Sequence, residues 1–123
     1  MKNFIYYKDI NTLKATGCVV ELSSCINTKK DLIQELSEKL NFPKYFSYNW
    51  DSLYDFLRDF SWINSKDIYI IHKEIPKLNN DDLKIYLEVL IDSLEDWLDD
   101  SEHDLYIFFS ELDKEKINNL LRI

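Results

Sequence analysis

The sequence predicts an α/β domain with a small three-stranded parallel sheet packed with helices, and two observations lead to this prediction. Three short apolar runs, at residues 18–23, 67–71 and 105–109, have the length and the β-branched or aromatic content of buried strands. These runs alternate with segments whose apolar residues recur at helical spacing, which implies parallel strands joined by right-handed crossovers. A chain with one glycine and two prolines also lacks the turn residues of an all-β protein.

The connection between the first two strands is predicted to hold two helices. The first begins at residues 27–28 and ends at residues 41–43, because the residue before a proline disfavours helical backbone. The second begins at Asn49 or Trp50, and asparagine is a favourable N-cap. The apolar faces of the two helices are formed by Leu32, Ile33, Leu36 and Leu40, and by Trp50, Leu53, Leu57 and Phe60.

A third, longer helix is predicted over residues 81–98, with Asn80 as its N-cap. Its apolar face is formed by Leu83, Leu87, Leu90, Leu94 and either Trp97 or Leu98. Residues 1–16 are an extension that either adds an edge strand or lies loosely on the surface. Residues 111–123 are a tail expected to form a short terminal helix. Since no repeat or linker interrupts the pattern, we expect one domain over residues 1–123.

Composition and cysteine content indicate a cytoplasmic protein without a cofactor. Charged residues interrupt the N-terminal apolar run, so it does not form a signal peptide, and no run approaches the ~20 residues that span a bilayer. Cys18 and Cys25 are expected to be free thiols in a reducing cytosol. No cysteine or histidine pair has metal-site spacing, so no metal or cofactor is predicted. His72 and His103 are expected to have structural roles, and we expect a monomer.

The negative charge is concentrated in one segment. The net charge is −8, yet residues 81–104 alone hold ten acidic residues and one lysine. Such a protein repels nucleic acid and attracts basic proteins, so we expect no direct nucleic-acid binding. Four of these acids, Glu88, Asp92, Glu95 and Asp99, follow helical spacing. We interpret them mainly as a solvated helix face, with attraction of a basic partner as the alternative.

The most informative segment runs from Asn41 to Phe60. Asp51 and Asp55 lie four residues apart, which places both carboxylates on one face of the second helix at a cost of roughly 0.2–0.5 kcal/mol. Nothing in the fold requires this pair, although Arg58 is spaced to assist Asp55. Tyrosines and a phenylalanine surround the acids in the sequence, namely Tyr45, Phe46, Tyr48 and Tyr54. Rigid aromatic residues around fixed acids are typical of a protein-binding hot spot, and a solvated acidic helix face is the alternative.

The segment from Leu40 to Asp55 resembles the core motif of the barstar family. The matching positions, with no gap between them, are Pro43, Tyr45, Phe46, Asn49, Asp51, Leu53, Tyr54 and Asp55. A looser likeness in the order of strands and helices extends over about residues 18–110. The resemblance implies a barstar-like fold and an intracellular protein inhibitor of a basic ribonuclease or related nuclease toxin, not an enzyme. Such a protein would serve in immunity or self-protection.

The resemblance also implies which residues bind the partner. Those residues are Tyr45, Asn49, Asp51, Tyr54, Asp55 and Asp96. Asp55 would be the central anion, in the place of a substrate phosphate, and Asp51 would make a second charged contact. Tyr45 would pack against the region of the catalytic base. Both acids should then point outward, free of bonds within their own chain.

The other members of this set would support the same surface. Asn49 would cap the second helix and shape the loop, and Tyr54 would replace the family's usual tryptophan. A further acid on the long helix is placed at Asp96, with Glu95 as the alternative. Ser47 stands where the family often has glycine, and a positive φ there would be unfavourable for serine. Such departures leave a different toxin nuclease open as the partner.

Two other functions are compatible with the acidic residues. A hydrolase could use Asp51 and Asp55 as its two carboxylates. That reading is the weaker one, because two acids one turn apart on an exposed helix share no evident pocket. An acidic mimic of nucleic acid, or a general protein-interaction module, would instead use the stripe within residues 81–104.

Overall fold

Four parallel strands form one sheet in the computed structural model, which describes residues 3–97 and 102–122. The strands are β1 (Ile5–Tyr7), β2 (Cys18–Leu22), β3 (Asp67–His72) and β4 (Asp104–Ser110), in the order β1-β4-β3-β2. The α/β class and the three predicted strands are confirmed. The sheet has four strands where three were expected, because the N-terminal extension adds β1 beside β4.

Burial on the sheet explains why the extension does not lie loosely on the surface. Phe4, just before β1, is buried with its ring centroid 4.9 Å from that of Phe109. Tyr7 is also buried, and its hydroxyl donates to the carbonyl oxygen of His72 at 2.5 Å. Burying two aromatic side chains contributes about 1.5–3 kcal/mol each, enough to hold a strand of only three residues.

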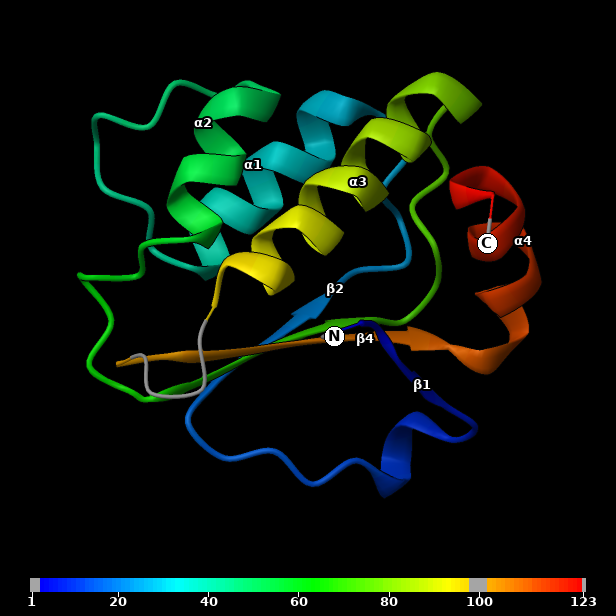
Figure 1. Cartoon of the computed structure of the whole chain (residues 1–123), viewed down its shortest axis with the longest axis horizontal. Coiled ribbons are helices and arrows are strands. Elements are labelled where there is room, and N and C mark those ends of the chain that lie inside the picture. Colours follow the sequence, from blue (N-terminus) through cyan, green and yellow to red (C-terminus); the bar gives the residue numbers. More distant parts are fainter. Residues whose placement is uncertain (1–2, 98–101, 123) are drawn as a thin grey trace.

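The helices lie mainly on one face of the sheet. They are α1 (Lys29–Lys39), α2 (Trp50–Leu57), α3 (Asn80–Asp96) and α4 (Lys114–Leu121), with short 3-10 turns η1 (Ile10–Thr12) and η2 (Glu111–Asp113). Figure 1 shows α1, α2 and α3 above the sheet and the segment with η1 below it. The short terminal helix predicted for the tail is confirmed as α4, which contacts α3.

The N-termini of α1, α2 and α3 are capped by side chains, with one correction to the sequence analysis. Thr28 caps α1 and Asn49 caps α2, as the sequence suggests. The N-cap of α3 is Asn79, whose Oδ1 accepts from the backbone N–H of Asp82 at 2.8 Å, and not Asn80. Two adjacent asparagines are equally suited to this role. α3 ends at Asp96 and Trp97 is already extended, so the helix is shorter than the predicted range to residue 98; the stripe residue Asp99 lies outside the described residues.

The core lies between the helices and the sheet. The side chains of β3 and β4 on this face, including Ile68, Ile70, Leu105, Ile107 and Phe109, are essentially inaccessible. The predicted apolar faces of the helices pack on them, except that Trp50 is only half-buried. Trp97 is buried, and its indole Nε1–H donates to the carbonyl oxygen of Leu57 at 2.9 Å, so the end of α2 is tied to the end of α3.

Both histidines are bonded within the fold, which fits the predicted structural roles. His72 is fully buried, with Nδ1 2.8 Å from the Phe108 carbonyl oxygen and Nε2 2.7 Å from the Tyr86 hydroxyl. Because a carbonyl oxygen only accepts, Nδ1 carries the proton and Nε2 accepts from Tyr86. His103 is also buried and bonds through Nδ1 to the carbonyl oxygen of Ser65 at 2.9 Å.

None of the helices within the described part of the chain is long and apolar enough to cross a membrane.

Candidate protein-binding site

The loop before α2 is an aromatic platform. Phe46 is buried, with its ring centroid 4.7 Å from that of Phe42 and 5.0 Å from that of Phe56. The ring of Tyr45 lies 5.2 Å from that of Phe56, yet Tyr45 is 70% exposed. A large ring is therefore offered to solvent on a packed support, which lowers the entropy lost when it binds.

Short hydrogen bonds tie this loop to the start of α2. The side chain of Asn49 accepts from the backbone N–H of Ser52 at 2.7 Å, and the Ser52 hydroxyl accepts from the backbone N–H of Ser47 at 3.1 Å. The positive φ in the loop belongs to Tyr48, at 32°, and not to Ser47. The strain considered for serine at the family's glycine position therefore does not arise.

The two acids of α2 lie on its exposed side, as their spacing predicts. Among the described residues, Asp51 makes no side-chain hydrogen bond or ion pair. Asp55 is 65% exposed at its side chain, but its Oδ1 accepts from Nη2 of Arg58 at 2.6 Å. The expectation that both acids are free of bonds within the chain is therefore wrong for Asp55. The ion pair forms because a spacing of three residues places Arg58 beside Asp55 at the end of α2.

Arg58 also reaches from α2 to the end of α3. Its Nη1 lies 3.4 Å from Oδ2 of Asp96, and the same oxygen accepts from the hydroxyl of Tyr54 at 2.6 Å. The guanidinium Cζ lies 3.9 Å from the centroid of the Tyr54 ring, a cation–π contact. The structure thus brings Tyr54, Asp55 and Asp96 together around Arg58. Of the two acids considered on the long helix, Asp96 is the one bonded to the α2 residues.

The bond to Asp96 keeps Tyr54 a hydrogen-bond donor. It is the largest cause that raises the pKa of the Tyr54 hydroxyl above its ordinary value, so this hydroxyl, which is protonated at neutral pH in any case, loses its proton only at still higher pH. Sequence reasoning noted Arg58 only as an aid to Asp55. Its bridge to Asp96 depends on the packing of α2 on α3, which no spacing in the sequence reveals.

The acidic stripe of α3 remains a separate feature. Glu88, Asp92 and Glu95 are exposed, and none of them forms an ion pair within the described part of the chain. This agrees with a solvated helix face. Asp96, which bonds to Tyr54 and Arg58, directly follows Glu95 of the stripe in the sequence.

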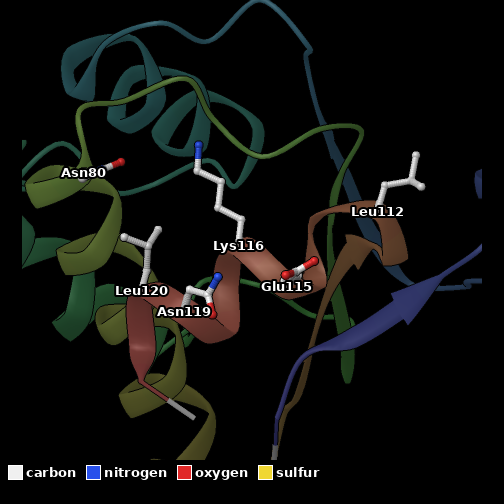
Figure 2. Close-up of a pocket in the computed structure, with 6 residues that line it drawn as sticks. All are labelled: Asn80, Leu112, Glu115, Lys116, Asn119 and Leu120. Carbon is white, nitrogen blue, oxygen red and sulfur yellow. The ribbon is translucent and has the colours of Figure 1, made fainter.

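The described residues show no metal site, and one surface hollow lies apart from α2 and its loop. No group of three histidine, cysteine or acidic side chains that could hold a metal ion occurs in residues 3–97 and 102–122. The hollow drawn in Figure 2 lies beside α4 and is lined by Asn80, Leu112, Glu115, Lys116, Asn119 and Leu120. None of these residues belongs to the α2 surface, so the two regions are distinct.

Comparison with known proteins agrees with the motif in the loop and α2. A family model described as Barstar (barnase inhibitor) matches residues 18–110, which include the six residues expected to bind a partner. β1 and α4 lie outside the matched residues, so the fourth strand is an addition to the matched segment. A comparison with curated proteins found no match. Since the family match covers well over half of its length, the chain belongs to the Barstar (barnase inhibitor) family.

Proposed function

We propose that this protein is a cytoplasmic inhibitor of a basic ribonuclease or related nuclease toxin, acting in immunity or self-protection. The observation that carries the proposal is the surface of α2 and its aromatic loop. It exposes Tyr45 and Asp51, whose side chains make no hydrogen bond or ion pair with the other described residues, next to the largely exposed Asp55. This surface lies in the segment that matches a family of nuclease inhibitors.

The chemistry of such a surface suits the active site of a ribonuclease. A ribonuclease site binds phosphate with cationic side chains, and a fixed carboxylate can take the place of the phosphate. Asp55 would accept charge-assisted hydrogen bonds from those cations, and Asp51 would make a second charged contact. Tyr45 and Tyr54 would exclude water around them, which strengthens the ion pairs.

The ion pair between Asp55 and Arg58 is compatible with this role. Both side chains are substantially exposed, at 65% and 37%, and exposed ion pairs contribute only about 0–1 kcal/mol. A carboxylate buried against several cations of a partner gains more than this. Asp55 therefore need not be unpaired in the free protein, because its weak ion pair with Arg58 can be exchanged for stronger pairs with the partner.

The direct test is inhibition of barnase and of other basic secreted ribonucleases by the purified protein. We expect loss of nuclease activity at one equivalent and a 1:1 complex in size-exclusion chromatography. Association should slow as salt rises, because the attraction of opposite charges is screened. If no ribonuclease in such a panel is bound, the proposal is wrong.

A variant of the central anion sharpens this test. Asp55→Ala should weaken binding by about 2–5 kcal/mol, an effect for which the barnase–barstar complex is itself the reference case. Stability should change by less than about 1 kcal/mol, because only an exposed ion pair is lost. Glu74→Ala, at an exposed acid away from α2, is the matched control and should bind as the parent does.

A second candidate function rests on the exposed acids of α3. A mimic of nucleic acid would use Glu88, Asp92 and Glu95, which are unpaired within the described part of the chain. Replacing these three by their amides should then abolish binding of a nucleic-acid-binding partner. If the same change leaves ribonuclease inhibition intact and Asp55→Ala removes it, the inhibitor function holds and the mimic does not.

A further inference from the structure

The guanidinium group of Arg58 occupies a small binding site formed by three side chains from two helices. Its Nη2 donates to Asp55 at 2.6 Å, its Nη1 to Asp96 at 3.4 Å, and its Cζ lies 3.9 Å from the centroid of the Tyr54 ring. Two carboxylates and an aromatic face are the groups with which a protein binds an arginine of another molecule. In the free protein, this site is occupied by Arg58 of the same chain.

A cation of another molecule can displace Arg58 from this site. The side chains of Arg58, Asp55 and Asp96 are 37%, 65% and 43% exposed, so water screens both ion pairs. Exposed ion pairs of this kind shift an equilibrium by about fivefold or less. The three contacts together still hold Arg58 beside Asp55. Under the proposed function, Asp55 is the carboxylate that binds a cation of the partner.

We propose that Arg58 is a specificity-determining residue, an internal competitor that a partner's cation must displace from Asp55. The inference rests on the proposed function, because it requires Asp55 to face cations of the partner. A partner with one cation would exchange one ion pair for another and gain little. A partner with several cations around Asp55 gains with each further contact. Arg58 thereby sets the minimum that a partner's cations must supply: a weakly basic surface gains too little to displace it, whereas a strongly basic active site displaces it and still binds.

The competing explanation is that Arg58 only positions Asp55, and the two make opposite predictions. Arg58→Gln removes the competitor, so it should bind the inhibited ribonuclease more tightly, by up to about fivefold. The matched control is Lys77→Gln, which removes one positive charge from an exposed position away from α2. Affinity of Arg58→Gln equal to that of the control, or weaker, would overturn the inference.

A second background shows whether the effect passes through Asp55. When Asp55→Asn is already present, position 55 has no carboxylate for Arg58 and the partner's cation to share, and only the pair of Arg58 with Asp96 remains. The gain from Arg58→Gln should then be clearly smaller than in the parent chain. An equal gain in both backgrounds would mean that Arg58 acts only through the overall field, and the inference would be wrong.

An experiment without a nuclease separates failure of this inference from failure of the proposed function. A hexaarginine peptide is titrated into the free protein while amide NMR signals of α2 and the end of α3 are followed. Arg58→Gln should bind the peptide at these residues several times more tightly than Lys77→Gln does. If this holds but no ribonuclease binds, the proposed function alone is wrong. If the two variants bind the peptide equally, the inference is wrong.

Discussion

His72 should make the stability of the domain depend on pH above the range in which carboxylates titrate. The imidazole is fully buried, stacks on Phe109 at 3.9 Å, and has both nitrogens engaged, by the Phe108 carbonyl and the Tyr86 hydroxyl. Burial lowers the pKa of His72 from 6.5 to about 4, against a smaller opposing effect of the hydrogen bond to Phe108. Lowering the pH from 7 to 5 should therefore destabilise the folded protein through His72.

The sign and size of the effect follow from this shift. The unfolded chain takes up a proton at His72 as the pH falls through 6.5, whereas the folded protein does so only near pH 4. Stability from this residue is complete above pH 6.5 and is lost as the pH falls toward 4. The full shift corresponds to about 3 kcal/mol, and at pH 5 the loss is about 2 kcal/mol. That is a large part of the roughly 5–15 kcal/mol that stabilises a typical domain.

Urea unfolding followed by tryptophan fluorescence at pH 7, 6 and 5 measures this loss. His72→Gln should remove the pH dependence in this window, even though the variant is less stable at pH 7, whereas His103→Gln should retain it. The window ends at pH 5 because Glu35 contributes below it. Burial raises the pKa of Glu35, but hydrogen bonds from Ser23 outweigh it and leave the pKa lowered. Equal stability of the parent protein at pH 7 and 5 would show that His72 does not take up its proton at a lower pH in the folded protein than in the unfolded chain.

Four further substitutions test the backbone, two helix caps and the exposed ring. Gly17 has a φ of 116°, and a Cβ there would lie 2.6 Å from the carbonyl oxygen of Asp67. Gly17→Ala should therefore lower the free energy of unfolding by about 1–3 kcal/mol. An unchanged urea midpoint would contradict this. Asn49→Ala should cost about 1 kcal/mol and weaken nuclease binding, while Asn79→Ala at the cap of α3 should cost as much stability and leave affinity unchanged. Tyr45→Ala should change stability by less than about 0.5 kcal/mol but lower affinity more than tenfold in a calorimetric titration; equal affinity would exclude Tyr45 from the interface.

Most of the fold could be predicted because its elements have clear periodicity. The strands β2, β3 and β4 are short apolar runs, and the buried faces of α1, α2 and α3 recur at helical spacing. β1 could not be decided from its three residues. Its strand conformation depends on the free edge of β4 and on the burial of Phe4 and Tyr7, which are tertiary contacts.

The candidate site was predictable within one helix but not between helices. The common face of Asp51 and Asp55 follows from helix geometry alone, and so does the reach of Arg58 to Asp55. The meeting of Arg58 and Tyr54 with Asp96 requires the crossing of α2 and α3, which is set by buried side chains elsewhere. For the same reason, the sequence favours Asp96 over Glu95 as the acid of the long helix without showing which of them contacts α2.

The way α2 is held explains why binding and stability should respond to different residues. A helix of eight residues is not stable alone, so its conformation depends on packing. That packing comes from Leu53, Phe56 and Leu57, which are buried, and from the indole of Trp97, which bonds to the last turn of α2. None of these contacts uses the exposed side of the helix. The acids there are held in place by the core beneath them, and substitutions at Asp51 should therefore alter binding while the fold remains.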